Sequence, residues 1–173
     1  KGKTSGDLWT VCRELSCRML MLAGIGDKDE CGRLVDEAVE SGEALKRFEM
    51  MVKLQGGDVS YIEDTSKFRK ASFSREVYAP ADGYITHMDS EKIGLTAVLL
   101  GAGREKKDDD INHAAGIIIA AKTGDFVKRG ELLATLFADD ESRLDGAESR
   151  YLSAVSIGDK KPAEQPMILD YID

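Results

Sequence analysis

Two short apolar runs separated by glycine-containing turns form the most regular pattern in the chain. The runs cover residues 117–121 and 132–137, and Gly124 and Gly130 lie in the polar connection between them. Short runs rich in β-branched residues and bounded by glycine turns are typical of strands. A second pair of short runs flanks a turn at residues 80–83. We therefore predict a small β unit built of two similar hairpins.

The first third of the chain has a helical period instead. Residues 8–23 are predicted to form a helix that is buried on most sides, because their apolar positions recur every three or four residues in a wide stripe. Gly24 and Gly26 are expected to end this helix. The candidates for its N-cap are Thr4, Ser5 and Asp7.

Two further amphipathic helices are expected over residues 28–40 and 43–54. Ser41 and Gly42 separate them, and a Gln-Gly-Gly-Asp stretch at residues 55–58 ends the second. No strand in this region supplies a core, so we predict that these helices pack on a larger one. The side chains expected to face inward on the last helix are Leu45, Phe48, Met51 and Val52.

The hydrophobic period changes from helical to alternating at Arg75, and we interpret this change as a domain boundary. The preceding residues 58–74 are polar and are predicted to be a linker with one helical turn near residues 61–63. The predicted domains are residues 1–74 and residues 75–173.

The second domain is predicted to mix helices with strands. A helix is expected over residues 89–99, where an Asp-Ser pair can cap its start, and residues 105–112 are expected to be a charged loop. Residues 140–155 are predicted to be a surface helix interrupted near Gly146, and residues 167–171 a last short strand. The predicted fold class is α+β.

Length and charge exclude several classes of partner. The 173 residues are enough for one ordinary domain or two small ones. The net charge of −8 and the absence of a long basic cluster argue against nucleic acid, which needs a concentrated positive field. No apolar run approaches the roughly 20 residues that span a bilayer. We expect neither a nucleic-acid nor a membrane partner, and, because the first residue is Lys1, a chain cut from a longer protein.

Three cysteines in helical patterns indicate a reducing, cytoplasmic setting. Thiolates bind zinc, but Cys12 and Cys17 are five residues apart on a helix and therefore lie on nearly opposite sides of it. No neighbouring histidine completes a site for them or for Cys31. Packing in the core is favoured over metal binding for all three.

Two histidines and one acidic run are further candidates for chemistry. His87 and His113 could act as general bases only with a partner carboxylate and a pocket, and a structural or surface role is favoured. Three adjacent aspartates could bind a hard cation but usually face water: Asp108, Asp109 and Asp110. We expect no metal site and no catalytic residue in this chain.

The most suggestive polar feature is a short segment that we call the GAGR loop, which consists of Gly101, Ala102, Gly103 and Arg104. Glycines at a helix end followed by arginine can offer backbone amides and a guanidinium to an anion. The alternative is a glycine C-cap with a solvated arginine. The position at a helix C-terminus, where the dipole disfavours anions, favours this alternative.

The order of the motifs resembles one enzyme family over essentially the whole chain. The most specific pieces are SGEALKRFEMMVKLQGGD, APADGYI, IGLTAVLLGAGR and GDFVKRGELLATL. In this order they closely resemble the C-terminal part of pyrimidine-nucleoside phosphorylase and thymidine phosphorylase.

The resemblance implies a specific reaction for the parent protein. Such enzymes cleave pyrimidine nucleosides with phosphate as co-substrate and without a cofactor, giving the free base and a pentose 1-phosphate, and they are homodimers. It implies that residues 1–74 are the last helices of an α/β domain plus a linker, and that residues 75–173 are an α+β domain with a barrel-sandwich-like β unit. The family's phosphate-binding and base-binding motifs have no match here. We therefore expect this chain to be scaffold, inactive alone, with the GAGR loop as a candidate element that closes over the substrate cleft.

Two other classes of protein compete with this interpretation. A biotinyl or lipoyl carrier module shares the barrel-sandwich shape, but such modules have a lysine in a hairpin after the second motif, where this chain has residues 138–142 without a lysine. A structural or interaction domain without phosphorylase activity is the other alternative. The related phosphoribosyltransferases lack the C-terminal unit altogether.

Overall fold

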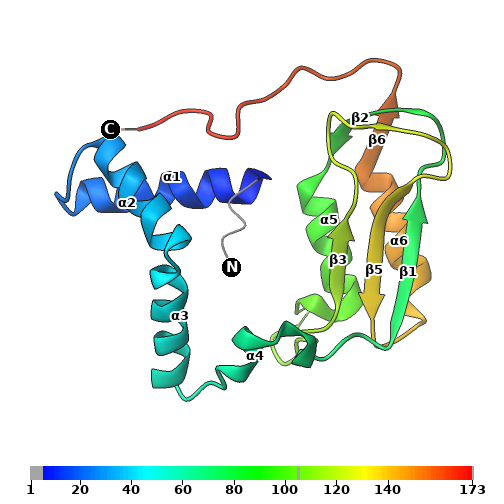
Figure 1. The fold of residues 1–173 in the computed structure, drawn as a ribbon. Coiled ribbons are helices and arrows are strands. Elements are labelled where there is room, and N and C mark those ends of the chain that lie inside the picture. The colour runs from blue at the N-terminus through cyan, green and yellow to red at the C-terminus, as the bar shows by residue number, and fades with distance from the viewer. Residues whose placement is uncertain (1–5, 105, 173) are drawn as a thin grey trace. The chain divides into compact units, whose positions relative to one another are not determined.

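A computed structural model describes residues 6–104 and 106–172. The chain divides into two compact units, which we describe separately (Figure 1). The helical unit comprises residues up to Phe68 together with the chain from Gln165 onward, and the β unit comprises Arg69–Glu164. Helices and strands are both present, so the α+β class is confirmed. Among the described residues, no helix has the length and apolar character needed to cross a membrane.

The helical unit begins with three helices whose bounds are close to those predicted: α1 (Gly6–Leu22), α2 (Lys28–Glu40) and α3 (Glu43–Leu54). Gly24 ends α1 in the left-handed conformation (φ +72°), and its neighbour Ile25 donates a backbone hydrogen bond to the carbonyl of Leu20. Asp27 caps α2 by accepting a hydrogen bond of 2.9 Å from the amide of Glu30. The short helices α4 (Ser60–Glu63) and η1 (Thr65–Lys67) follow.

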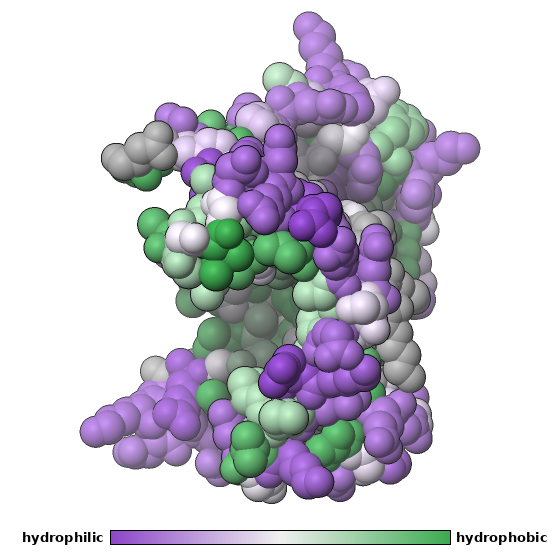
Figure 2. Space-filling view, turned by 60° about the vertical axis from the view of Figure 1, so that its left-hand side comes forward, coloured by the Kyte–Doolittle hydropathy of each residue, from purple (hydrophilic) through white to green (hydrophobic). Residues whose placement is uncertain are grey.

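The prediction that α1 is buried on most sides is wrong for this chain. Cys17 is its one buried side chain among the described residues, whereas Leu8 and Leu22 are 77% and 89% exposed. On α3 no described side chain is buried, and two of the four residues expected to face inward, Phe48 and Met51, are exposed. Figure 2 accordingly shows hydrophobic residues at the surface among hydrophilic ones. The physical reason is that the described part of this unit contains no sheet to cover these helices.

Polar contacts join the first two helices and the end of the chain. Arg13 donates two hydrogen bonds of 2.7 Å to the two carboxylate oxygens of Asp36, which links α1 to α2. The centroid of the Tyr171 ring lies 4.0 Å from the guanidinium carbon of Arg18 and 5.1 Å from the Nζ of Lys28. The chain around Tyr171 is irregular, so the strand predicted over residues 167–171 is wrong. The N-cap candidates Thr4 and Ser5 lie outside the described residues, and Asp7 lies in the first turn of α1.

The β unit contains two antiparallel sheets of three strands each. One sheet has the order β1-β5-β3, and the other has the order β4-β2-β6. The strands are β1 (Phe73–Tyr78), β2 (Gly83–Met88), β3 (Gly116–Ile119), β4 (Phe126–Val127), β5 (Leu132–Ala138) and β6 (Val155–Gly158).

One of the two predicted hairpins is confirmed. β3 pairs with β5, with Ile118 opposite Thr135, although β4 in their connection joins the other sheet. β1 and β2 do not pair, because the turn between them leads the chain from one sheet into the other. Gly83 is required at this crossing: it has φ +150°, and a Cβ there would lie 2.7 Å from Cγ2 of Ile157. The alternating pattern predicts strands but does not reveal which sheet each one joins.

Two helices complete the core of the β unit. Asp89 caps α5 (Ser90–Ala97) by accepting a hydrogen bond from the amide of Lys92, as predicted, and a π-helical segment (Val98–Ala102) continues it. The helix α6 (Arg143–Ala154) runs without a break, so the interruption predicted near Gly146 is wrong. It continues because one face packs into the core, and the four residues buried on that face are Leu144, Ala147, Tyr151 and Ala154.

Candidate functional site

The GAGR loop is held tightly at its base. It begins inside the π-helical segment after α5, where Gly101 has φ +104°, and the amide of Asn112 donates a hydrogen bond of 2.9 Å to the carbonyl of Gly101. Gly103 packs closely, because a Cβ there would lie 2.7 Å from Cγ2 of Val98. Arg104 is exposed beyond this base. π-helical turns often occur at functional sites, and an exposed guanidinium can bind carboxylate or phosphate.

A carboxylate beside the loop joins three segments of the β unit, and we call its members the Asp139 cluster: Arg69, Ser72, Asn112 and Asp139. The Oδ1 atom of Asp139 accepts hydrogen bonds from the amide and the hydroxyl of Ser72 at 2.8 and 2.9 Å. The Oδ2 atom accepts one of 2.7 Å from the side-chain amide of Asn112 and forms an ion pair with Arg69. The cluster therefore connects the start of the unit, the end of the charged loop and the end of β5.

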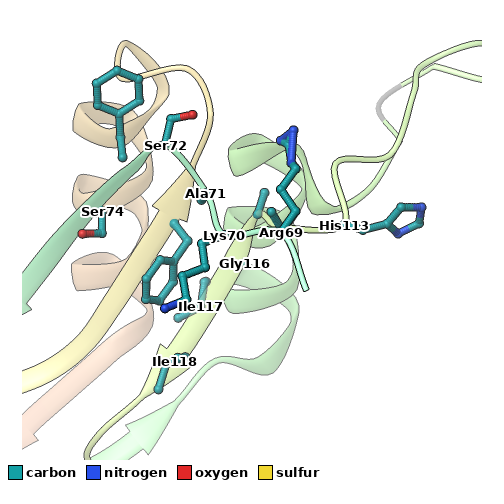
Figure 3. Close-up of a pocket in the computed structure, with 13 residues that line it drawn as sticks. Arg69, Lys70, Ala71, Ser72, Ser74, His113, Gly116, Ile117 and Ile118 are labelled. Atoms are coloured by element: carbon teal, nitrogen blue, oxygen red, sulfur yellow. The ribbon is translucent and has the colours of Figure 1, made fainter. Parts of the chain in front are cut away.

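A groove of about 700 Å³ lies along the same segments (Figure 3). Arg69 and Ser72 line it from the chain leading into β1, and His113 lines it from the chain leading into β3. The strands themselves add Ser74 of β1 and Gly116, Ile117 and Ile118 of β3. Its volume is in the range of small-molecule sites. Of the described residues that line it, Arg69 and Lys70 are charged, both are basic, and none is acidic. Because Arg69 is already ion-paired with Asp139, the groove is suited to a polar group more than to an anion, and no motif in the sequence indicates it.

The remaining polar candidates do not converge on one site. His87 is exposed on β2, whereas His113 lines the groove. The carboxylate of Asp89 is used by the cap of α5, where the hydrogen bond from the Lys92 amide lowers its pKa. Asp109 accepts a hydrogen bond of 2.8 Å from the amide of Lys106 in a local turn.

The prediction of core packing is confirmed for two of the three cysteines. Cys17 and Cys31 are buried, and the thiol of Cys17 donates to the carbonyl of Lys28 at 3.3 Å. Cys12 is exposed, so the prediction is wrong for this residue. Burial raises the pKa of the Cys31 thiol, which disfavours the thiolate that a metal would need. Within residues 6–104 and 106–172, no group of three His, Cys, Asp or Glu side chains could hold a metal ion.

Sequence reasoning missed the Asp139 cluster entirely. Ser72 and Asp139 are 67 residues apart, and Asn112 and Asp139 are 27 apart, so no local spacing joins them. The one available signal is the position of Asp139 directly after a buried strand, where a polar side chain commonly satisfies loop amides.

Comparison with known proteins gives a consistent result for both units. Residues 84–158 match the family model described as pyrimidine nucleoside phosphorylase C-terminal domain. The chain is 38% identical over 143 residues to a pyrimidine-nucleoside phosphorylase of Bacillus subtilis, an alignment that covers 82% of this chain and 33% of that protein. It is 31% identical over 170 residues to the same enzyme of Geobacillus stearothermophilus, covering 98% of this chain and 39% of that protein.

A Staphylococcus aureus pyrimidine-nucleoside phosphorylase is 35% identical over 160 residues, covering 92% of this chain and 37% of that protein. The chain thus spans between 33% and 39% of the length of these relatives. It is similar over most of its length to the C-terminal part of pyrimidine-nucleoside phosphorylases, and its residues 84–158 match the C-terminal domain of that family.

Proposed function

We propose that this chain forms the C-terminal part of a pyrimidine-nucleoside phosphorylase. The parent enzyme would transfer the pentose of a pyrimidine nucleoside to phosphate, releasing the free base and a pentose 1-phosphate. The observation behind the proposal is that most of this chain, in both units, aligns with about a third of three such enzymes. Nucleoside and phosphate would be bound mainly by polypeptide outside these residues, in a cytoplasmic homodimer that needs no cofactor.

The division into two units supports a division of roles. The helices of residues 1–74 would complete an α/β domain, which agrees with their exposed apolar faces. Residues 75–173 would form the family's barrel-sandwich-like domain, and the two three-stranded sheets are compatible with that architecture. The regular elements of this region end at Gly158, and the chain from Gln165 onward is grouped with the helical unit. An alternative carrier function is disfavoured because β5 is followed by Asp139 and by α6, not by a hairpin that presents a lysine.

Within this proposal the β unit acts as scaffold and the GAGR loop closes over the substrate. Its rigid base would hold Arg104 at a fixed distance from the core, and the exposed guanidinium could then contact an anionic substrate when the domains approach. Excluding water at that moment would strengthen the contacts to the developing charge in the transition state.

A chimera tests the proposal directly. These 173 residues would replace the matching C-terminal portion of the Bacillus subtilis relative, and phosphate-dependent release of uracil or thymine would be measured. We expect an active chimera and no activity from the chain alone. A folded but inactive chimera, or an active isolated chain, would contradict the proposal.

The role of the loop needs its own variant. Arg104→Ala in the active chimera should lower kcat/KM by about tenfold or more, since charge-assisted hydrogen bonds to substrate are strong. Arg150→Ala, which removes an exposed arginine from α6, is the matched control and should leave both constants unchanged. Unchanged kcat and KM for Arg104→Ala would end the closure hypothesis while leaving the family assignment in place.

A further inference from the structure

We propose that Asp139 is a positioning residue that fastens the chain entering the β unit to the base of the GAGR loop, so that the two move as one body. The role of the loop in closure rests on the function proposed above. The fastening itself rests only on contacts within the β unit and can be tested without any substrate.

The first half of the fastening is the entering segment. The division between the units falls between Phe68 and Arg69, so Arg69 is the first residue of the β unit. Asp139 binds this segment at two points, through its ion pair with Arg69 and through the two hydrogen bonds from Ser72. The strand pairing takes over immediately afterwards, where Phe73 lies opposite Ala138. The entering segment is therefore held from its first residue onward.

The second part of the proposed connection is the base of the GAGR loop, where Asn112 makes most of the contacts. Its side-chain amide donates to Asp139 at 2.7 Å, while its own backbone amide donates to the carbonyl of Gly101 at 2.9 Å. Its Oδ1 atom accepts from the amide of Ala114 at 3.0 Å and from Arg69 at 3.3 Å. Asn112 thus joins the end of the charged loop to Gly101, the first residue of the GAGR loop, and Arg69 and Asp139 both bind Asn112.

The charge and burial of Asp139 make this arrangement specific. Its side chain is 28% exposed, so its contacts are partly shielded from water. Its carboxylate accepts hydrogen bonds from Ser72 and from Asn112, which are 40 residues apart in the chain. Any displacement of residues 69–72 must carry Asn112 with it or break charge-assisted hydrogen bonds. Movement at the junction would in this way be transmitted to the GAGR loop.

An exchange of the two side chains provides the decisive variant. In Asp139→Asn, the new side-chain amide faces the side-chain amide of Asn112, and two donors meet if Oδ1 keeps its bonds to Ser72. In Asn112→Asp, two carboxylates face each other and no donor lies between them. Each single change therefore removes the hydrogen bond between residues 112 and 139. The double variant Asn112→Asp with Asp139→Asn restores one donor and one acceptor, and it keeps an acceptor for Ser72, Ala114 and Arg69. Double-mutant cycles isolate such a pair interaction from the effect of each change alone.

Hydrogen exchange of the backbone amides of Ser72 and Asn112 measures the coupling in the whole chain. Each single variant should speed exchange at both amides by about tenfold, and the double variant should return both to within about threefold of the unchanged protein. Asp140→Asn is the control, because the neighbouring Asp140 accepts hydrogen bonds from Ser142 and forms an ion pair with Arg143 at the start of α6. No hydrogen bond joins it to Ser72 or Asn112 among the described residues, so exchange at those two amides should not change. Faster exchange at only one of the two amides, or no rescue in the double variant, would overturn the proposal.

A kinetic measurement then separates this inference from the proposed function. In the active chimera the two single variants should lower kcat/KM and the double variant should restore it, which a general loss of stability would not do. An inactive unmodified chimera would overturn the proposed function while leaving the exchange result, and thus the fastening, intact. Restored exchange without restored kinetics would overturn the link between the fastening and closure.

Discussion

The β unit buries thirteen side chains in one continuous cluster, whereas the described part of the helical unit buries three apolar side chains. The cluster in the β unit combines both sheets with α6 and with Leu100 of the π-helical segment, and the partly buried Ile93 of α5 packs against it. The helices of the helical unit also carry apolar residues, but several large side chains of α1 and α3 are exposed, among them Leu15, Met19 and Leu54. Each unit has clear amphipathic elements, so the difference lies in whether a second layer covers them.

This contrast indicates that the two units have different sources of stability. A helix is stabilised mainly by burial of its apolar face, and a face without a partner contributes little. The exposed stripe of α1 is therefore expected to require a partner surface, whereas the β unit has its own core. The predictions below test that contrast, beginning with the largest expected effect.

The largest effect is expected in the core of the β unit. Leu136→Ala removes a side chain that is fully buried in the core cluster and should lower the free energy of unfolding of the β unit by about 2–5 kcal/mol. Leu15→Ala on α1 is the matched control, and because Leu15 is 60% exposed it should change stability by less than about 0.5 kcal/mol. Urea denaturation of both variants measures the difference, and equal losses would refute the contrast between the units.

Substitution of the glycine at the crossing between the sheets should have the next largest effect on stability. Gly83→Ala forces a residue with a side chain into φ +150° and brings its Cβ against Ile157, so we expect a loss of about 1–3 kcal/mol in the free energy of unfolding. Gly146→Ala, on α6 with only an ordinary contact of 3.5 Å to Leu99, should instead stabilise the unit by about 0.5–1 kcal/mol. Thermal denaturation shows whether each substitution raises or lowers the stability. A gain in stability for Gly83→Ala would contradict the positive φ and the close contact with Ile157 at this position.

A smaller, stabilising effect is expected when a buried hydroxyl without a hydrogen-bond partner among the described residues is removed. The hydroxyl of Tyr151 is fully buried and has no hydrogen-bond partner among the described residues, and burial raises its pKa. Tyr151→Phe removes the unsatisfied group and should raise the free energy of unfolding by about 1 kcal/mol. Calorimetry measures this gain. A clear loss of stability would mean that the hydroxyl has a partner, such as an ordered water molecule.

The smallest effect concerns pH and the helical unit. The hydrogen bonds from Arg13 lower the pKa of Asp36 below its value in an unfolded chain, which is about 3.9. The pair therefore stabilises the contact between α1 and α2 at pH values above about 4, and this contribution is lost as the pH falls through the lowered pKa. Asp36→Asn should reduce the acid sensitivity of the helical signal in circular dichroism. Identical acid titrations of the two proteins would show that the pair contributes nothing.

The helices were predictable where local signals sufficed. Ser41 and Gly42 separate α2 from α3 as predicted, because the end of a helix is set by adjacent residues, and the bounds predicted for both helices agree with the structure. β1 begins at Phe73, two residues before the change of period at Arg75, since pairing with β5 extends the strand beyond its alternating part. Strand positions were thus readable, but strand partners were not, as the passage from β1 to β2 shows.

The candidate site was predictable only in part. The glycines of the GAGR loop identify the end of a helix, and the structure contains that end. The contacts of Asn112 and Asp139 depend on a fold that brings distant segments together, so neither residue stands out in the sequence. Burial was overestimated on α1 because an apolar stripe indicates a need for a partner and does not show that the partner lies within the same chain.

Hydrogen exchange along the whole chain tests the central contrast most directly. The account predicts strong protection in β5 and in α6, where the core is continuous, and protection lower by at least about a hundredfold in α1 and α3. Equal protection in the two units would contradict it, because the exposed apolar helices would then be stable without a covering layer.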